Sequence, residues 1–97
     1  MSAMRDMPAH DDHAAAAWDA SRRQADQFRE ELHRHIGLLD NQMAVYWSAL
    51  AQYSKHNMIF QVRRVERELR FGSRERTTLT RMLAALDHRF PASTTDP

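Results

Sequence analysis

The arginines in the second half of the chain are the residues whose type and spacing best suit binding to another molecule. If this segment is helical, Arg63, Arg64, Arg67 and Arg70 fall within about 120° of one helix face. A guanidinium group offers a fixed fork of hydrogen-bond donors that matches a phosphate or a carboxylate. The pattern therefore predicts binding to nucleic acid or to an acidic partner. The candidate residues are Arg63, Arg64, Arg67, Arg70, Arg74 and Arg76.

The distribution of charge gives this basic surface a second interpretation. Residues 49–97 hold eight Arg and one Lys against five acids, a net charge of +4, and residues 1–48 hold five Arg against eight acids, a net charge of −3. Glu66 and Glu68 stand at helical spacing from arginines of the basic face, so ion pairs can neutralise part of it. The pI near 8.4 is also low for a dedicated nucleic-acid-binding protein. A solvated, salt-bridged face is therefore favoured, with nucleic-acid binding as the alternative function.

The histidines and acids do not combine into a known metal or catalytic motif. Glu30 and His33 form Glu-x-x-His, which is half of the ligand set of a di-iron helical bundle. The second copy that such a site needs is absent, and the chain has no cysteine to supply a thiolate ligand or a nucleophile. The sequence contains neither a glycine-rich phosphate loop nor a nucleophile elbow. It predicts no enzyme, no metal, no cofactor and no small-molecule substrate.

A run of residues spaced seven apart predicts a long amphipathic helix whose apolar face turns into an arginine face. The run is Trp18, Ala25, Leu32, Leu39, Tyr46, Tyr53 and Phe60, and the same register next reaches Arg67. Aromatic residues at helical spacing commonly fill a core, and where they stay exposed they mark an interface. We therefore expect a homo-oligomer, or docking on a larger helical protein, through an aromatic stripe. Its candidate residues are Trp18, Tyr46, Trp47, Tyr53 and Phe60.

The elements that position these residues are expected to be helices alone. The chain has only 2 Gly and 3 Pro, and the prolines stand near its ends, so the interior has little turn chemistry for a β protein. Breaks at Gly37 and Gly72 predict an all-α, three-helix arrangement with helices at about 12–36, 40–71 and 74–89. The second helix is long and central, and a second copy or a partner completes the arrangement. A break at residues 54–57 is the alternative, less favoured because that segment lacks Gly and Pro.

The expected organisation is a flexible N-terminal arm at 1–11, a single helical domain at 12–90 and a flexible C-terminal tail at 91–97. No leader segment is visible, and no stretch approaches the roughly 18 apolar residues of a membrane span, so a cytoplasmic location without a membrane is expected. Together these features predict a small non-enzymatic interaction or regulatory module.

Overall fold

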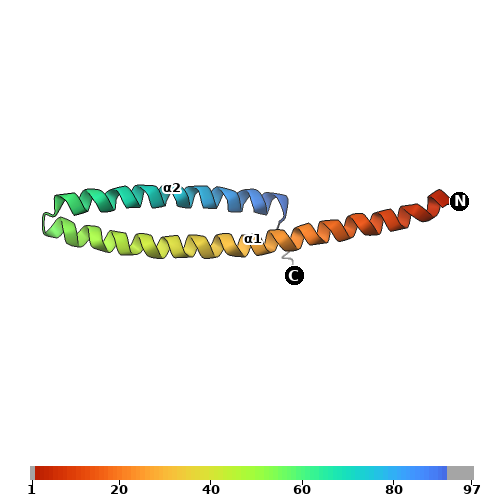
Figure 1. Ribbon diagram of the computed structural model, residues 1–97, viewed down its shortest axis with the longest axis horizontal. Helices are drawn as coiled ribbons and strands as arrows, with labels where there is room; N and C mark the ends of the chain where they lie inside the picture. Colours follow the sequence, from red (N-terminus) through yellow and green to blue (C-terminus); the bar gives the residue numbers. More distant parts are fainter. Residues whose placement is uncertain (1, 92–97) are drawn as a thin grey trace.

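The protein is an antiparallel hairpin of two long helices. The computed structural model describes the backbone of residues 2–91 and the side chains of residues 14–91. Helix α1 spans Ser2–Lys55 and helix α2 spans Ile59–Arg89, and the two lie side by side (Figure 1). The first part of α1 continues past the end of α2, which gives the molecule its extents of 83 × 28 × 15 Å. The all-α prediction is confirmed, and no strand occurs between residues 2 and 91.

The predicted three-helix arrangement is wrong, because the chain turns at a place where we expected a continuous helix. Both glycines lie inside helices, Gly37 in α1 and Gly72 in α2. The turn falls instead at residues 56–58, overlapping the segment 54–57 that we considered the less favoured break. The cause is Asn57, which adopts the left-handed conformation with φ 55. Asparagine is the residue that most readily replaces glycine in this conformation.

Two backbone hydrogen bonds complete this turn and end α1. The N–H of Met58 donates to the carbonyl of Tyr53 at 2.9 Å, and the N–H of Asn57 donates to the carbonyl of Ser54 at 3.2 Å. This pair of bonds, from the second and the first residue past the cap, is the Schellman motif. Helix α2 then begins with the N–H of Val62 donating to the carbonyl of Met58 at 2.9 Å. The tight connection reverses the chain and sets the two helices antiparallel.

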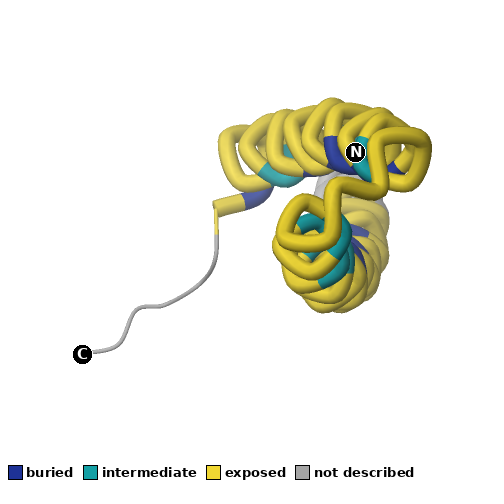
Figure 2. The backbone as a smooth tube through the Cα atoms, turned by 90° about the vertical axis from the view of Figure 1, so that its left-hand side faces the viewer, coloured by how far each residue is buried: buried dark blue, intermediate teal, exposed yellow. Residues whose placement is uncertain are grey.

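One continuous seam holds the helices together, formed by residues spaced alternately three and four apart. This spacing keeps a single stripe of each helix facing its neighbour, as in an antiparallel coiled coil. Figure 2 shows the buried and half-buried residues on the sides of the two tubes that face each other, and the other residues whose side chains are described are exposed. The apolar residues of the seam are Ala25, Leu32, Ile36, Leu39, Met43, Tyr46, Leu50 and Tyr53 of α1, and Val62, Val65, Leu69, Leu79, Leu83, Leu86 and Phe90 with α2.

Two arginines at the seam fix the register of the pairing. Nε of Arg29 donates to Oδ1 of Asp87 at 2.7 Å, and the same guanidinium also donates to the carbonyl of Phe90. Nearer the turn, Nε of Arg76 donates to Oδ1 of Asp40 at 2.7 Å. Sliding one helix along the other by a turn would break both sets of bonds. Polar residues at a coiled-coil seam commonly select register in this way.

The predicted N-terminal arm and C-terminal tail lie partly outside the residues that the structure describes. Helix α1 begins at Ser2, so its backbone includes most of the expected arm, although the side chains of residues 1–13 lie outside those described. Residues 92–97 of the tail also lie outside the described residues. The seam ends where the rings of Trp18 and Phe90 lie 5.2 Å apart, tilted by 35°.

Candidate functional site

The residues of the predicted aromatic stripe are not gathered on one surface. Tyr46 and Tyr53 are half-buried in the seam, where they pack against α2 rather than facing solvent. Trp18 packs on Phe90 at the end of the seam. The seven-residue run of α1 is thus the inner column of the hairpin up to Tyr53. The turn then shifts the register, so that Phe60 lies on the outer side of α2.

Trp47 is exposed on one lateral side of the hairpin. This residue is 58% exposed, and it stands one position after the seam residue Tyr46. It borders an open hollow of about 340 Å³ with Leu69 and Arg70 of α2. Among the five candidate interface residues, Trp47 and Phe60 have the most exposed side chains, and they lie on different sides of the molecule. The five residues therefore do not form a single surface in one hairpin.

The opposite lateral side carries a larger group of exposed apolar residues, which we name the apolar side face. Next to the seam on this side, each helix carries one row of residues spaced seven apart. The row of α1 includes Phe28 and His35, and the row of α2 includes Glu75 and Met82. Nε2 of His35 lies 3.6 Å from Oε2 of Glu75, which joins the two rows. The exposed apolar residues of this face are Phe28, Leu38, Val45, Phe71 and Met82.

The centre of the apolar side face is well exposed and shallowly hollowed. Leu38 is 62% exposed, Val45 66% and Phe71 64%. A hollow of about 110 Å³ lies between Tyr46 and Phe71, and another of about 290 Å³ lies beside Val45 and Tyr53. We did not predict this face from the sequence. Its signal was the seven-residue spacing of Leu38 and Val45, which stand next to the buried column.

The candidate arginines separate into three groups once the seam is known. Arg76 lies at the edge of the seam and is bound to Asp40, and its hydrogen bond holds the pKa of the Asp40 carboxyl below the ordinary value. Arg64 lies beside Val45 on the apolar side face. The remaining four lie on the outer surface of α2. These outer residues are Arg63, Arg67, Arg70 and Arg74.

The expected salt bridges within the basic face do not form. The ion pairs within residues 14–91 are those of Arg29 with Asp26 and Asp87, of Arg76 with Asp40, and of His35 with Glu75. Neither Glu66 nor Glu68 takes part in any of them. The outer arginines are therefore exposed cations without an ionic partner in the described part of the chain. Arg81, which stands seven residues after Arg74, belongs to the same surface.

The Glu-x-x-His segment does not form part of a metal cluster. Glu30 and His33 are both exposed on α1. Among the residues whose side chains are described, no group of three or more His, Cys, Asp or Glu is placed to hold a metal ion. No helix in the described part of the chain combines the length and apolar character needed to cross a membrane.

Comparisons with protein families, with curated proteins and with solved structures find no match to this chain. The surfaces of the hairpin are therefore the evidence for its function.

Proposed function

We propose that this chain is a small non-enzymatic interaction module that self-associates, with a second copy covering the apolar side face. The observation that carries this proposal is the exposure of Leu38, Val45 and Phe71 together on one side of the hairpin. Several large apolar residues exposed on one side of a small protein are typical of an interface. Burying these residues against a second hairpin would convert the two-helix layer into a bundle of four helices.

The limited stability expected of a single hairpin favours a second layer of helices. Each helix buries only one stripe, and the paired part of the hairpin, about residues 24–90, is of a size at which a single core rarely supplies more than about 3–5 kcal/mol. Isolated helices also depend on tertiary packing for most of their stability. A lone hairpin with one seam is thus marginal, and a second copy would add apolar burial along its length.

The available area fits a stable dimer. The paired part of the hairpin, about residues 24–53 of α1, is roughly 45 Å long, and two packed helices are about 20 Å wide. One lateral face therefore offers roughly 900 Å², close to the about 800 Å² per partner of a standard stable interface.

The charges of the apolar side face also suit contact with a second copy. Three acids and two arginines border it, a net charge of −1, so two copies would not repel strongly. The outer surface of α2, by contrast, presents exposed arginines without acids and would repel itself. The charged residues that border the apolar side face are Glu31, Arg64, Glu68, Glu75 and Arg89.

The test is the solution mass by light scattering over a range of protein concentrations. We expect the unaltered chain to form a dimer, and Phe71→Glu to shift it to monomer because a carboxylate would be buried at the centre of the interface. Trp47→Glu, on the opposite side, is the matched control and should leave the dimer intact. Circular dichroism checks that each variant stays helical.

Two results would overturn the proposal. A chain that is monomeric at every concentration would exclude a second copy as the occupant and leave a different helical protein to cover this face. A dimer that survives Phe71→Glu but dissociates with Trp47→Glu would move the interface to the other side of the hairpin.

A further inference from the structure

We propose that the outer surface of α2 binds the phosphate backbone of duplex DNA, an activity separate from self-association. Five arginines, which we name the arginine row, would make the contacts. They differ from the set that the sequence predicts, because Arg76 is bound to Asp40, Arg64 lies on the apolar side face, and Arg81 joins the outer surface. The arginine row consists of Arg63, Arg67, Arg70, Arg74 and Arg81.

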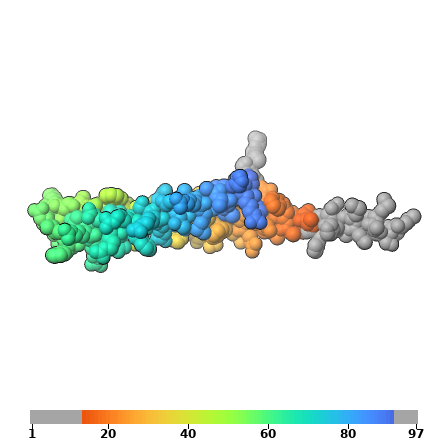
Figure 3. All heavy atoms as spheres, turned by 90° about the horizontal axis from the view of Figure 1, so that it is seen from above, coloured from red at the N-terminus to blue at the C-terminus, as the bar shows by residue number. Residues whose placement is uncertain are grey.

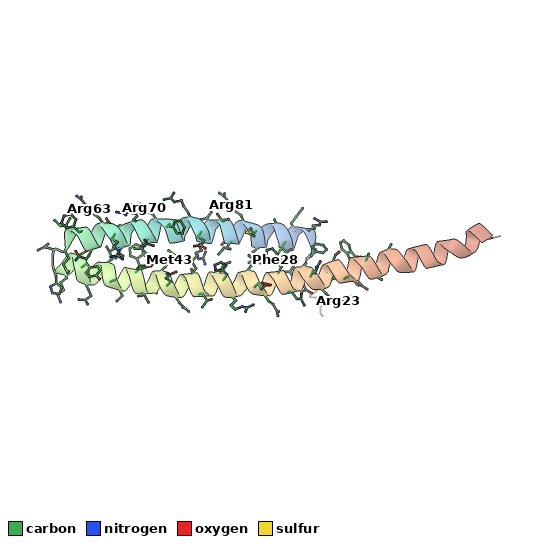
Figure 4. All side chains as sticks on the ribbon, viewed as in Figure 1. Arg23, Phe28, Met43, Arg63, Arg70 and Arg81 are labelled. Carbon is green, nitrogen blue, oxygen red and sulfur yellow. The ribbon has the colours of Figure 1, made fainter. Side chains whose placement is uncertain are left out.

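The row is straight and faces away from α1. Arg67, Arg74 and Arg81 stand seven residues apart, on the side of α2 opposite the seam, so successive members are about 10.5 Å apart along the helix. Arg63 and Arg70 flank them on the neighbouring column. Figure 4 shows Arg63, Arg70 and Arg81 pointing away from α1, and Figure 3 looks onto this outer surface of α2.

The charge of the row is not neutralised within the hairpin. None of the ion pairs within residues 14–91 involves any of its five arginines. The outer column of α1 differs, since it carries mostly uncharged residues. That column consists of Gln27, Arg34, Asn41, Ser48 and Lys55. The concentration of cations on α2 is therefore a property of one helix face and not of the whole surface.

The geometry favours a duplex over the other polyanions. From Arg67 to Arg81 the row spans about 21 Å, a length over which duplex DNA presents about twelve phosphate charges. Helices that bind a membrane surface insert an apolar face, whereas the columns of the arginine row contain no large apolar residue between Arg63 and Arg81. Proteins that bind single strands stack successive bases on several aromatic rings, whereas these columns carry one exposed ring, that of Phe60, which precedes Arg63.

The experiment is a titration of a fluorescent DNA duplex of about 20 base pairs by anisotropy, at several salt concentrations between about 50 and 200 mM. Each phosphate contact contributes about −0.9 to the slope of log affinity against log salt, so five contacts predict a slope of about −4.5 per hairpin. The double variant Arg67→Gln/Arg74→Gln should weaken binding and reduce the magnitude of the slope by about 1.8.

Arg34→Gln is the matched control, because it removes one exposed arginine from the outer column of α1. It should leave the slope close to that of the unaltered chain. Absence of duplex binding at the lowest salt would overturn the proposal, as would equal weakening by Arg34→Gln. Tighter binding to vesicles of phosphatidylcholine and phosphatidylserine, or to a single strand, than to the duplex would also overturn it. The double variant should keep its solution mass, which separates this test from that of self-association.

Discussion

A Cβ atom placed on Gly72 would lie 3.2 Å from Cγ and 3.3 Å from Sδ of Met43 across the seam. At this point α2 packs against α1 with no room for a larger side chain unless Met43 moves. Gly72 is buried in the middle of a helix, where glycine is normally unfavourable. Its presence is explained by the close approach of Met43, and not by a break in the helix.

Gly72→Leu should therefore destabilise the hairpin. The added side chain improves helix propensity by less than about 1 kcal/mol, but overpacking a seam typically costs about 1–3 kcal/mol. We expect a net loss in the free energy of unfolding, measured by urea denaturation at one fixed protein concentration. Combining Gly72→Leu with Met43→Ala should recover part of this loss, because the alanine vacates the space. Unchanged or increased stability of Gly72→Leu would show that the two helices pack less closely in solution.

Gly37→Ala should have the opposite effect. A Cβ at Gly37 would meet nothing within 4 Å, and the residue is exposed inside α1. Alanine would cost no packing here and would gain about 1 kcal/mol of helix propensity. The free energy of unfolding should rise by about that amount. A decrease would indicate that Gly37 lies at a contact with another molecule. A lower solution mass of the variant would then show that this contact is an interface between copies of the chain.

These two glycines explain why the fold was only partly predictable. Seven-residue spacing correctly predicted an all-helical chain, since that periodicity depends only on local helix geometry. A glycine in sequence has two interpretations, a helix end or a close contact, and only the neighbouring helix decides between them. We expected Gly72 to end a helix and residues 54–57 to continue one. Instead, Gly72 lies inside α2, and Asn57 adopts the left-handed conformation in the turn that ends α1.

The surfaces were less predictable than the helices because they depend on where the turn falls. A continuous helix through residues 54–57 would place Tyr53, Phe60 and Arg67 on one face. The turn ends that register, so Tyr53 faces the seam while Phe60 and Arg67 face outward on α2. The position of the turn therefore decides, for every later residue, whether its side chain faces the seam or the outer surface. The exposure of Leu38 likewise follows from there being only one helix for α1 to pack against.

The turn itself gives a third prediction. Asn57→Val should lower the free energy of unfolding by about 1–2 kcal/mol, because a β-branched residue is strained at the φ of 55 found there. Asn57→Gly should be tolerated, since glycine adopts this conformation freely. Urea denaturation of both variants at equal concentration provides the measurement. Equal stability of the valine and glycine variants would contradict the left-handed turn.

The ion pair of Asp40 and Arg76 gives a prediction for pH. Hydrogen bonding from Arg76 lowers the pKa of the Asp40 carboxyl below its ordinary value of about 3.9. The unfolded chain therefore binds a proton at Asp40 more readily than the folded chain does. The stabilisation from this pair is fully present above the unfolded pKa and is lost as the pH falls through the folded pKa. Because both side chains are nearly half exposed, the effect should be small and should weaken with salt.

Asp40→Asn should accordingly lower the thermal midpoint at pH 7, and the difference from the unaltered chain should shrink as the pH falls below about 4. Arg76→Gln should show the same convergence, because it removes the other half of the pair. Asp19→Asn is the control, since Asp19 forms no ion pair among the described residues. A difference between Asp40→Asn and the unaltered chain that stays constant between neutral and acid pH would mean that the carboxylate is not held by Arg76 in solution.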